Sequence, residues 1–483
     1  MKKGSKVLAR LREAERWDAA NYNPADRGLW DRVDSMSFNA AASPQSRRTA
    51  RNRARYLVAN NAYAAGAASA IVAAVAGTAP RLQLADATSN RETLALIEND
   101  FGEWSAAVGL DDKLRAMRHA KFVDGESFAI LYNNPKLTLT SGVMLDVRPI
   151  DCDRVTAAYA SLPDPLDVDG VLLDKFGDVV SYRVLNYNPG DVGIVANIDD
   201  ATVYPAINVC HWYRQQYPEQ VRGYSELAPA LELFMLIDRY SKAVVQASET
   251  AADLAMVFMT DSQELDGADN IDDKQARRSI VPEDKPFVQI PWMRGMTMTI
   301  PEGWDVKQLS AEQPSNSYGM LVDEILAQIG AAINVPKLLM KNSAENYNYS
   351  SARVDLQNFQ NAVRLDRVSM RQHVLDPIWR AWYAEYRAIN GLKINPCVTW
   401  YFDGFFHVDP LKEANAQIAR VNAGLSSLAA EYGAKGQDWE RELQQIARER
   451  SYVKELEEEY GVKLFPTNEE KFDSSDDSRI DDV

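Results

Sequence analysis

Residues 229–258 read PALELFMLIDRYSKAVVQASETAADLAMVF, and this stretch decides the fold. It opens with a proline, a residue that suits the first turn of a helix, and no proline or glycine interrupts it afterwards. We therefore predict one helix over 229–258, with a length of about 45 Å at 1.5 Å per residue.

A second long helix is predicted over 314–336. It should begin near Pro314–Ser317 and stop at Asn334-Val335-Pro336, because proline disfavours helical backbone in the residue before it. Four apolar residues recur every four positions and mark one face of this helix, which we expect to be an interface between subunits: Leu321, Ile325, Ile329 and Ile333. Between the two helices, residues 261–313 are acidic and contain short β-like pieces and several prolines.

A polar, Asn-rich stretch, KNSAENYNY (341–349), follows the second helix. We expect Ser350 or Ser351 to cap a third long helix that runs toward Asn390 and kinks at Pro377. After it, Asp409 and Pro410 should open a helix over 411–431. A charged helix is predicted over 438–460, and the acidic residues 464–483 read as a disordered tail.

Residues 120–215 are predicted to be rich in β-structure. FAILYNN (128–134) has the composition of a strand, and VLLDKFGDVVSYRVL (171–185) that of a hairpin with its turn at Asp174–Gly177. VYPAINVCHWYR (203–214) is a further strand candidate. With the long helices, these strands indicate an α+β fold.

The charge balance argues against a protein that grips DNA by bulk positive charge. The chain of 483 residues has 53 Lys+Arg and 69 Asp+Glu, a formal net charge of −16. Residues 1–60 are nevertheless basic, and five arginines near their end either touch phosphates or form a solvated helix face: Arg47, Arg48, Arg51, Arg53 and Arg55. Residues 61–80 carry no charge, but their Ala and Gly content favours a tightly packed soluble helix over a membrane span.

Enzymatic motifs are absent from the sequence. It contains no Gly-Lys dipeptide for a phosphate-binding loop, no His-Glu-x-x-His and no Gly-x-Ser-x-Gly. The three cysteines are too far apart for a disulfide framework or a zinc site, and Cys210 and His211 should point to opposite faces of a strand. For Asp151-Cys152-Asp153 and Asp111-Asp112, ends of strands or helix caps are favoured over metal binding. We therefore expect neither catalysis nor a metal or cofactor.

The long helices have apolar faces that one chain of this plan leaves partly uncovered, which indicates oligomerisation through these helices. Several stretches, in this order, resemble tailed-bacteriophage portal proteins of the lambda type. They are RYLVANNAYAAGAASAIVAAVAGTAPRLQ (55–83), VRGYSELAPALELF (221–234), DEILAQIGAAINVPKLLMKN (323–342) with NYSSAR (348–353), DGFFHVDPLKEANA (403–416) and AGLSSLAAEYGAKGQDWERELQQIARER (423–450).

The resemblance implies a ring, typically of twelve subunits, at one vertex of the capsid. It also implies a division of the chain: an N-terminal segment and β-rich wing (1–228), a stem helix (229–258), a small α/β clip (259–313), a second stem helix (314–336), a tunnel loop (337–349), a wing helix and return (350–408), a helical crown (409–463) and the acidic tail (464–483). Four residues of the tunnel loop would then face DNA: Lys341, Asn342, Asn346 and Asn348.

The partners that the resemblance implies are further copies of the chain, double-stranded DNA in the channel, the terminase large subunit, the head–tail adaptor and the major capsid protein or scaffold. The protein would be assembled in the bacterial cytoplasm, reside in the virion and serve DNA packaging and ejection. Two other readings stay open. One is a nuclease or ATPase of the packaging machinery, which would need either a phosphate-binding lysine motif, which is missing, or a metal-binding carboxylate cluster. The other is a membrane-associated pore built from the Ala-rich helix.

Overall fold

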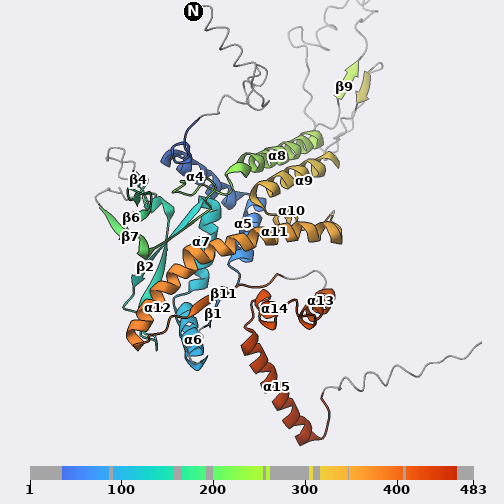
Figure 1. Ribbon diagram of the computed structural model, residues 1–483. Helices are drawn as coiled ribbons and strands as arrows, with labels where there is room; N and C mark the ends of the chain where they lie inside the picture. The colour runs from blue at the N-terminus through green and yellow to red at the C-terminus, as the bar shows by residue number, and fades with distance from the viewer. Residues whose placement is uncertain are drawn as a thin grey trace, which may run out of the picture. The chain divides into compact units, whose positions relative to one another are not determined.

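The computed structural model describes residues 35–85, 91–156, 166–191, 200–253, 257–260, 304–307, 316–345, 347–405 and 410–464. It divides into two compact units. Unit 1 comprises Met1–Ala228 and Ala344–Val483, and unit 2 comprises Pro229–Ser343. Helices and small antiparallel sheets occur together (Figure 1), so the α+β prediction is confirmed.

The described part of unit 1 begins with three helices, α3 (Phe38–Ala41), α4 (Pro44–Asn60) and α5 (Ala62–Val75). The Ser43 hydroxyl caps α4, and the Asn61 side chain caps α5 by accepting from the backbone N–H groups of Tyr63 and Ala64. In α5, Ala64 and Ala67 are fully buried, because small side chains let neighbouring elements approach closely. The predicted packed helix within 61–80 is confirmed.

Among the described residues, no single helix has the length and apolar character needed to cross a bilayer. Among these residues, α4 and α5 reach that length and apolar composition only when they are taken together, and they meet at an angle of 99°.

A three-stranded antiparallel sheet has β2 (Glu126–Asn133) between β3 (Leu145–Ile150) and β8 (Val209–Tyr213). The predicted strand at 128–134 is thus confirmed, with a start two residues earlier. Helix α7 (Leu110–Asp124) packs on this sheet and leads into β2 through Gly125, whose φ is +95°. A side chain at Gly125 would collide with the backbone of Tyr224.

The two faces of this sheet contact different partners. Phe128 and Val209 belong to an apolar cluster with Tyr182 of a second sheet. On the opposite face, the Trp212 Nε1–H donates to the Ser369 hydroxyl at 3.0 Å, and Cys210 lies against Val374. Because His211 faces the cluster, the prediction that Cys210 and His211 point apart is confirmed.

The second sheet has the order β4 (Asp167–Val168), β5 (Val171–Leu173), β6 (Val179–Leu185), β7 (Ala201–Pro205). Strands β5 and β6 form the predicted hairpin at 171–185, with Gly177 at a φ of +89°. The single strand predicted over 203–214 is wrong. It is two strands in different sheets, because β7 ends at Pro205, which cannot donate to a ladder, and a 3-10 turn (Ala206–Asn208) precedes β8.

Aromatic side chains fill a second core of unit 1, between α6 (Arg91–Ala107), α12 (Asp376–Asn390) and the paired strands β1 (Arg81–Ala85) and β11 (Cys397–Tyr401). The Phe101 ring contacts Trp379, Trp382 and Trp400 edge-on, at centroid distances of 5.1–5.8 Å. The prediction that 379–386 packs in the core is confirmed for its aromatic residues, and for 400–406 it is confirmed at Trp400.

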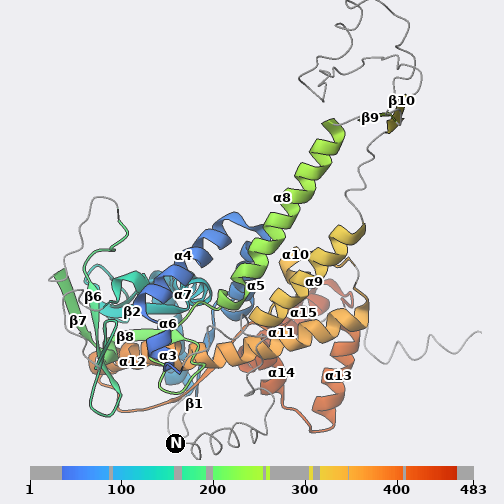
Figure 2. The ribbon, with the colours of Figure 1, turned by 90° about the horizontal axis from the view of Figure 1, so that it is seen from above.

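Helix α11 (Tyr349–Met370) continues into α12 through one π-helical turn, Arg371–Leu375 (Figure 2). Pro377 follows this turn after one residue, Asp376. Its ring would clash with the carbonyl four residues earlier in an ordinary α-helix, and the wider turn relieves that clash. The end of the helix at Asn390 is confirmed, and where a kink at Pro377 was predicted the structure has this π-helical turn just before the proline.

The C-terminal helices are α13 (Pro410–Asn422), α14 (Leu428–Ala434) and α15 (Trp439–Tyr460). Pro410 opens α13 as predicted, whereas Asp409 lies outside the described residues. The single helix predicted over 411–431 is wrong, because Gly424 adopts a φ of +69° and Ser427 caps a new helix. The prediction of 438–460 is confirmed, with Asp438 as N-cap of α15. The tail predicted at 464–483 lies outside the described residues apart from Leu464.

Unit 2 contains α8 (Leu231–Asp253), β9 (Val257–Thr260), β10 (Trp304–Lys307), α9 (Asn316–Ile333) and α10 (Lys337–Lys341). Helices α8 and α9 lie side by side (Figure 1), where the Tyr240 and Tyr318 rings stack at 5.5 Å. The helix predicted to reach 258 is too long. Val257 and Phe258 instead pair with β10, because β-branched and aromatic residues favour strands. Most of the predicted excursion at 261–313 lies outside the described residues.

Candidate functional site

The segment 337–349, predicted as an open loop, starts with a helix. Residues 337–341 form α10, which follows Pro336 and buries Met340. The sequence KLLMK consists of strong helix formers, so the prediction of a loop is wrong over these five residues. The helix ends at Asn342, whose backbone is left-handed (φ 48°) and donates to the Leu338 carbonyl.

The remaining asparagines have different positions. Asn348 is the N-cap of α11: its side chain accepts from the Ser351 N–H at 2.8 Å, and the Ser351 hydroxyl accepts from the Asn348 N–H at 3.2 Å. This capping box corrects the prediction that Ser350 or Ser351 is the cap. Asn346 lies outside the described residues. Lys341 and Asn342 belong to unit 2, whereas Asn348 belongs to unit 1.

Lys341 is held by an acidic residue of α9. Its ammonium donates to Asp323 at 2.8 Å, and Lys337, one turn earlier on α10, lies 3.6 Å from the other oxygen of the same carboxylate. The hydrogen bond from Lys341 lowers the pKa of Asp323 below its ordinary value, although burial opposes the shift. One carboxylate thus faces two ammonium groups.

The apolar face of α9 is buried in part within the chain itself. Ile325, Ile329 and Ile333 have exposed fractions of 4%, 0% and 4%, whereas Leu321 is 44% exposed. Of the four residues predicted at a subunit interface, only Leu321 has a side chain open to another molecule in this structure. The interface itself stays a prediction for that residue.

Two of the five arginines near the N-terminus, Arg47 and Arg51, are buried in ion pairs, whereas Arg53 is exposed and Arg48 and Arg55 are half-buried. Arg47 pairs with Asp169, Arg51 pairs with Asp153, and both arginine side chains are at least 95% buried. For Arg47 and Arg51, the sequence had left open either contact with phosphates or a solvated helix face, and neither holds. Arg47, Arg51 and Arg222 line a cavity of about 320 Å³ at the start of α4, in which each of these guanidinium groups has a carboxylate partner.

Glu126 is the centre of this buried cluster. It is fully buried and accepts from the Arg222 guanidinium (2.6 and 2.9 Å), the Gly223 N–H (2.9 Å) and His211 Nε2 (3.3 Å). Burial alone would raise the pKa of Glu126, but the Arg222 charge and the hydrogen bonds outweigh it and hold that pKa well below its usual range.

The hydrogen bonds of His211 resemble a catalytic relay but serve the core. Burial lowers the pKa of His211, so the ring is neutral and carries one N–H. Since Glu126 can only accept, Nε2 carries the proton and Nδ1 accepts from the Tyr182 hydroxyl at 3.3 Å. All three side chains are at most 7% exposed, so no substrate reaches them.

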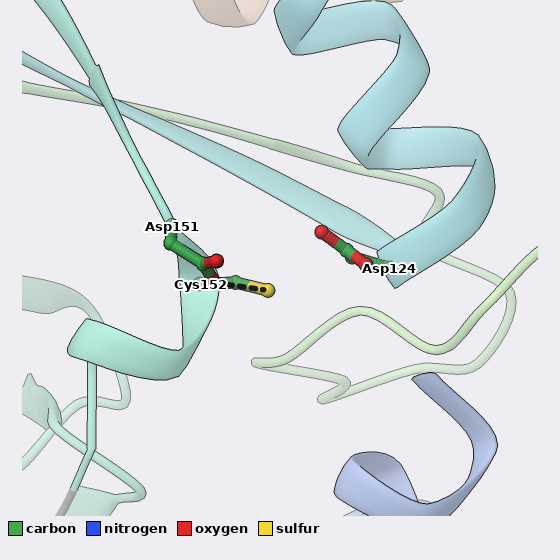
Figure 3. A group of neighbouring side chains, drawn as sticks. All are labelled: Asp124, Asp151 and Cys152. Carbon is green, nitrogen blue, oxygen red and sulfur yellow. Dashed lines mark hydrogen bonds between the residues drawn. The ribbon is translucent and has the colours of Figure 1, made fainter. Parts of the chain in front are cut away.

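One group of side chains in the described residues has the spacing of a metal site: Asp124, Asp151 and Cys152 (Figure 3). Their ligand atoms lie within 4.8 Å of one another. However, the Arg55 guanidinium donates to Asp124 at 2.6 and 2.9 Å and to Asp151 at 2.9 Å, so a cation already occupies the carboxylates. Burial also raises the pKa of the Cys152 thiol well above its usual value.

The donor set therefore fits a structural ion-pair cluster. Asp151 also caps the short 3-10 turn Cys152–Arg154 by accepting from the Asp153 N–H, in line with the predicted strand-end or cap role. Asp111 and Asp112 lie in the first turn of α7, where carboxylates complement the helix dipole.

Sequence reasoning missed Asp323, Lys337 and the role of Glu126. The Lys-x-x-x-Lys spacing of 337 and 341 was a usable signal, because residues four apart share a face once the segment is helical. For Glu126 no local signal exists, since its partner Arg222 is 96 residues away.

A family model described as phage portal protein, lambda family, matches residues 27–367. A comparison with curated proteins finds no significant match.

Among solved structures, a chain from the virion of a native gene transfer agent particle is similar, with 16% identity, a TM-score of 0.42, and coverage of 82% of this chain and 99% of the other. A chain from the neck of an empty particle of that kind has 18% identity, a TM-score of 0.43, and coverage of 85% and 97%. A portal protein of the HK97 family from Corynebacterium diphtheriae has 13% identity, a TM-score of 0.29, and coverage of 74% and 95%.

The family model spans well over half of the chain. It includes the buried cluster around Glu126 and the three helices of unit 2, α8, α9 and α10. It also includes three of the stretches that carry the resemblance in full. The chain belongs to the lambda family of phage portal proteins.

Proposed function

We propose that the protein forms a closed ring at one capsid vertex of a phage-like virion, with a central channel for double-stranded DNA. DNA would pass through this channel during packaging and again during ejection. Membership of the portal family is the observation that carries this proposal.

The surface of unit 2 supports assembly into a ring. Five large apolar side chains are exposed by 41–68% on its two long helices: Met235, Leu236, Val245, Met320 and Leu321. Water disfavours such a surface on an isolated pair of helices, and neighbouring copies that pack the same helices together would cover it.

The charge of the chain supports a conduit rather than a clamp. Each firm phosphate contact adds a grip that is independent of sequence, and a protein with a net charge of −16 makes few of them. Lysines such as Lys341 would then supply weak and short-lived contacts to DNA as it slides.

Within this proposal, α8 and α9 are the stem, and the antiparallel pair of β9 with β10 is the base of a clip. The clip would meet the terminase large subunit during packaging and the head–tail adaptor afterwards. Helices α13, α14 and α15 would form the crown inside the capsid. The protein would make or break no bond itself.

Native mass spectrometry of the full-length protein tests the ring. We expect one closed stoichiometry, near twelve. A monomer that stays monodisperse at high concentration contradicts the proposal.

An in vitro packaging reaction, scored by nuclease-protected DNA, tests the conduit. Capsids assembled with this protein should protect DNA only when terminase and ATP are present. ATP hydrolysis by the purified ring and DNA, without terminase, would favour the packaging enzyme instead.

A further inference from the structure

The three C-terminal helices α13, α14 and α15 have no core of their own. No side chain described within 410–464 is buried. Polar contacts hold the helices in place: Arg420 of α13 pairs with Glu431 of α14 at 3.0 Å, and Arg441 of α15 lies 3.6 Å from Glu98 of α6. Ion pairs of exposed arginines stabilise a fold only slightly, so these helices lack the apolar burial that normally keeps helices packed.

One side of α13 carries large apolar side chains that are open to solvent. Leu411 and Ile418 lie seven residues apart, and Leu425 continues the interval just after the helix ends. Their exposed fractions are 72%, 59% and 80%. Residues seven apart return to nearly the same side of a helix, so Leu411 and Ile418 form a stripe, which we call the α13 stripe.

A second stripe with the same interval runs along the whole of α15. Its members are Trp439, Ile446, Val453 and Tyr460, and none of them is buried. Tyr460 is 70% exposed. Helix α15 extends away from α13 (Figure 1), and the exposure of the α13 stripe shows that the two stripes do not cover each other within one chain.

A second copy of the chain offers the surface that fits each stripe. Two helices whose apolar residues both repeat every seven positions can interdigitate these side chains along their length. A ring is closed by contacts in which each subunit uses two different surfaces, one for each neighbour. The α13 and α15 stripes are two such surfaces, and every copy carries both.

We propose that the α13 stripe of one subunit packs on the α15 stripe of the next subunit, so that these helices gain their apolar core only in the ring. The inference rests on the proposed ring and adds to it an interface outside unit 2. DNA is not the partner, because its phosphates offer nothing apolar to cover these side chains.

Disulfide cross-linking of assembled full-length rings tests the pairing. Cys397 is exposed and is replaced by serine in every variant, whereas Cys152 and Cys210 are buried and stay. One variant carries Ile418→Cys. It is mixed in turn with each of four variants that carry a single cysteine in the α15 stripe: Trp439→Cys, Ile446→Cys, Val453→Cys or Tyr460→Cys.

A disulfide forms only where the two Cα atoms come within about 7 Å, so covalent dimers in a mixture require contact between different copies. We expect oxidation to give dimers in at least one of the four mixtures. A chain that carries both cysteines of that mixture should give a ladder of cross-linked species up to the complete ring.

The matched control mixes Ala419→Cys with Gln444→Cys. Both residues are exposed, and Ala419 lies about 100° round the helix from Ile418. This mixture should give no dimers.

Hydrogen exchange of rings with Ile418→Glu is a second readout. This side chain is 59% exposed within the chain, so the substitution leaves the subunit folded. Protection should be lost in both α13 and α15, because one substitution uncovers both stripes. Loss in α13 alone would contradict the pairing.

Three further results would overturn the inference. If rings form and none of the four mixtures gives dimers, the stripes serve another protein, such as a capsid or scaffold protein, while the ring proposal stands. If the chain with both cysteines forms its disulfide only within itself, the stripes meet inside one subunit. If native mass spectrometry finds no ring of the wild type, the ring proposal fails and the inference fails with it.

Discussion

Replacing Glu126 by glutamine removes the charge at the centre of the buried cluster and keeps the size of the side chain. Arg222 and Arg51 then stay buried, with side-chain exposures of 1% and 5%, and lose the carboxylate that they share. Removing one partner of a buried ion pair costs about 3–5 kcal/mol. Asp169 and Asp153 still neutralise part of the charge, which favours the lower end.

This cost converts into a shift of the unfolding temperature. Unit 1 has roughly 370 residues, and at about 2.1 cal/mol/K per residue its unfolding entropy is about 0.8 kcal/mol/K. A loss of 3–5 kcal/mol therefore lowers the unfolding temperature by about 4–6 °C. Tryptophan fluorescence can follow the unfolding of unit 1, because several of the chain's ten tryptophans are buried there, among them Trp212 on β8.

The pH dependence of this difference is a second readout. Because the folded pKa of Glu126 is depressed, its stabilisation is complete above the unfolded value of about 4.3 and is lost as the pH falls through the folded value. The gap between wild type and Glu126→Gln should be constant from about pH 5 to 8 and shrink below about pH 4.3.

Glu458→Gln is the control, because it removes the same charge from an exposed pair with Lys454 on α15. The Glu458 side chain is 72% exposed, and this variant should change the unfolding temperature by less than about 1 °C. An unfolding temperature of Glu126→Gln equal to that of the wild type at pH 7 would refute the reasoning. So would a gap that persists unchanged at low pH.

Further predictions concern the helices, a cap and the cations. Ile329→Ala should destabilise unit 2 by about 2–5 kcal/mol, seen as faster limited proteolysis, and normal resistance would show that this site is not packed. Leu321→Glu should leave the fold intact but reduce ring formation on native gels, and rings at wild-type yield would exclude Leu321 from the interface. Asn348→Ala should cost about 1 kcal/mol and increase hydrogen exchange in the first turn of α11, where unchanged exchange would contradict the capping box. Zn²⁺ or Mg²⁺ should not raise the unfolding temperature of the wild type, because Arg55 occupies the carboxylates; a stoichiometric increase would mean that an ion displaces it.

Local sequence patterns were sufficient to predict those helices and turns whose start or end depends only on residues close by in the sequence. The period of the isoleucines placed α9, and Asn334 before a buried Val335 and Pro336 ended it. Gly177 marked the turn of the hairpin, and Pro410 opened α13. In each case the signal and its cause lie within a few residues of each other.

Long-range partners decided the points at which the sequence misled. Val257 and Phe258 are compatible with helix, and only pairing with β10, some 50 residues later, makes them a strand. Arg47 and Arg51 resemble a solvated or phosphate-binding face until Asp169 and Asp153 fold against them. No local pattern encodes such a pairing.

The candidate site shows the same division. Lys341 was predicted from its place in a polar segment, whereas Asp323 and Lys337 became visible only when α10 folded back on α9. Likewise, three of the four residues of the α9 face proved to be buried inside the chain, because an apolar stripe does not say whether its cover is intramolecular.

Electron microscopy of the purified full-length protein tests the central claim most directly. Class averages viewed along the symmetry axis should show a closed ring of one subunit number with an open centre that admits duplex DNA. Particles that are open arcs, or rings whose axis is filled by protein, would contradict the account.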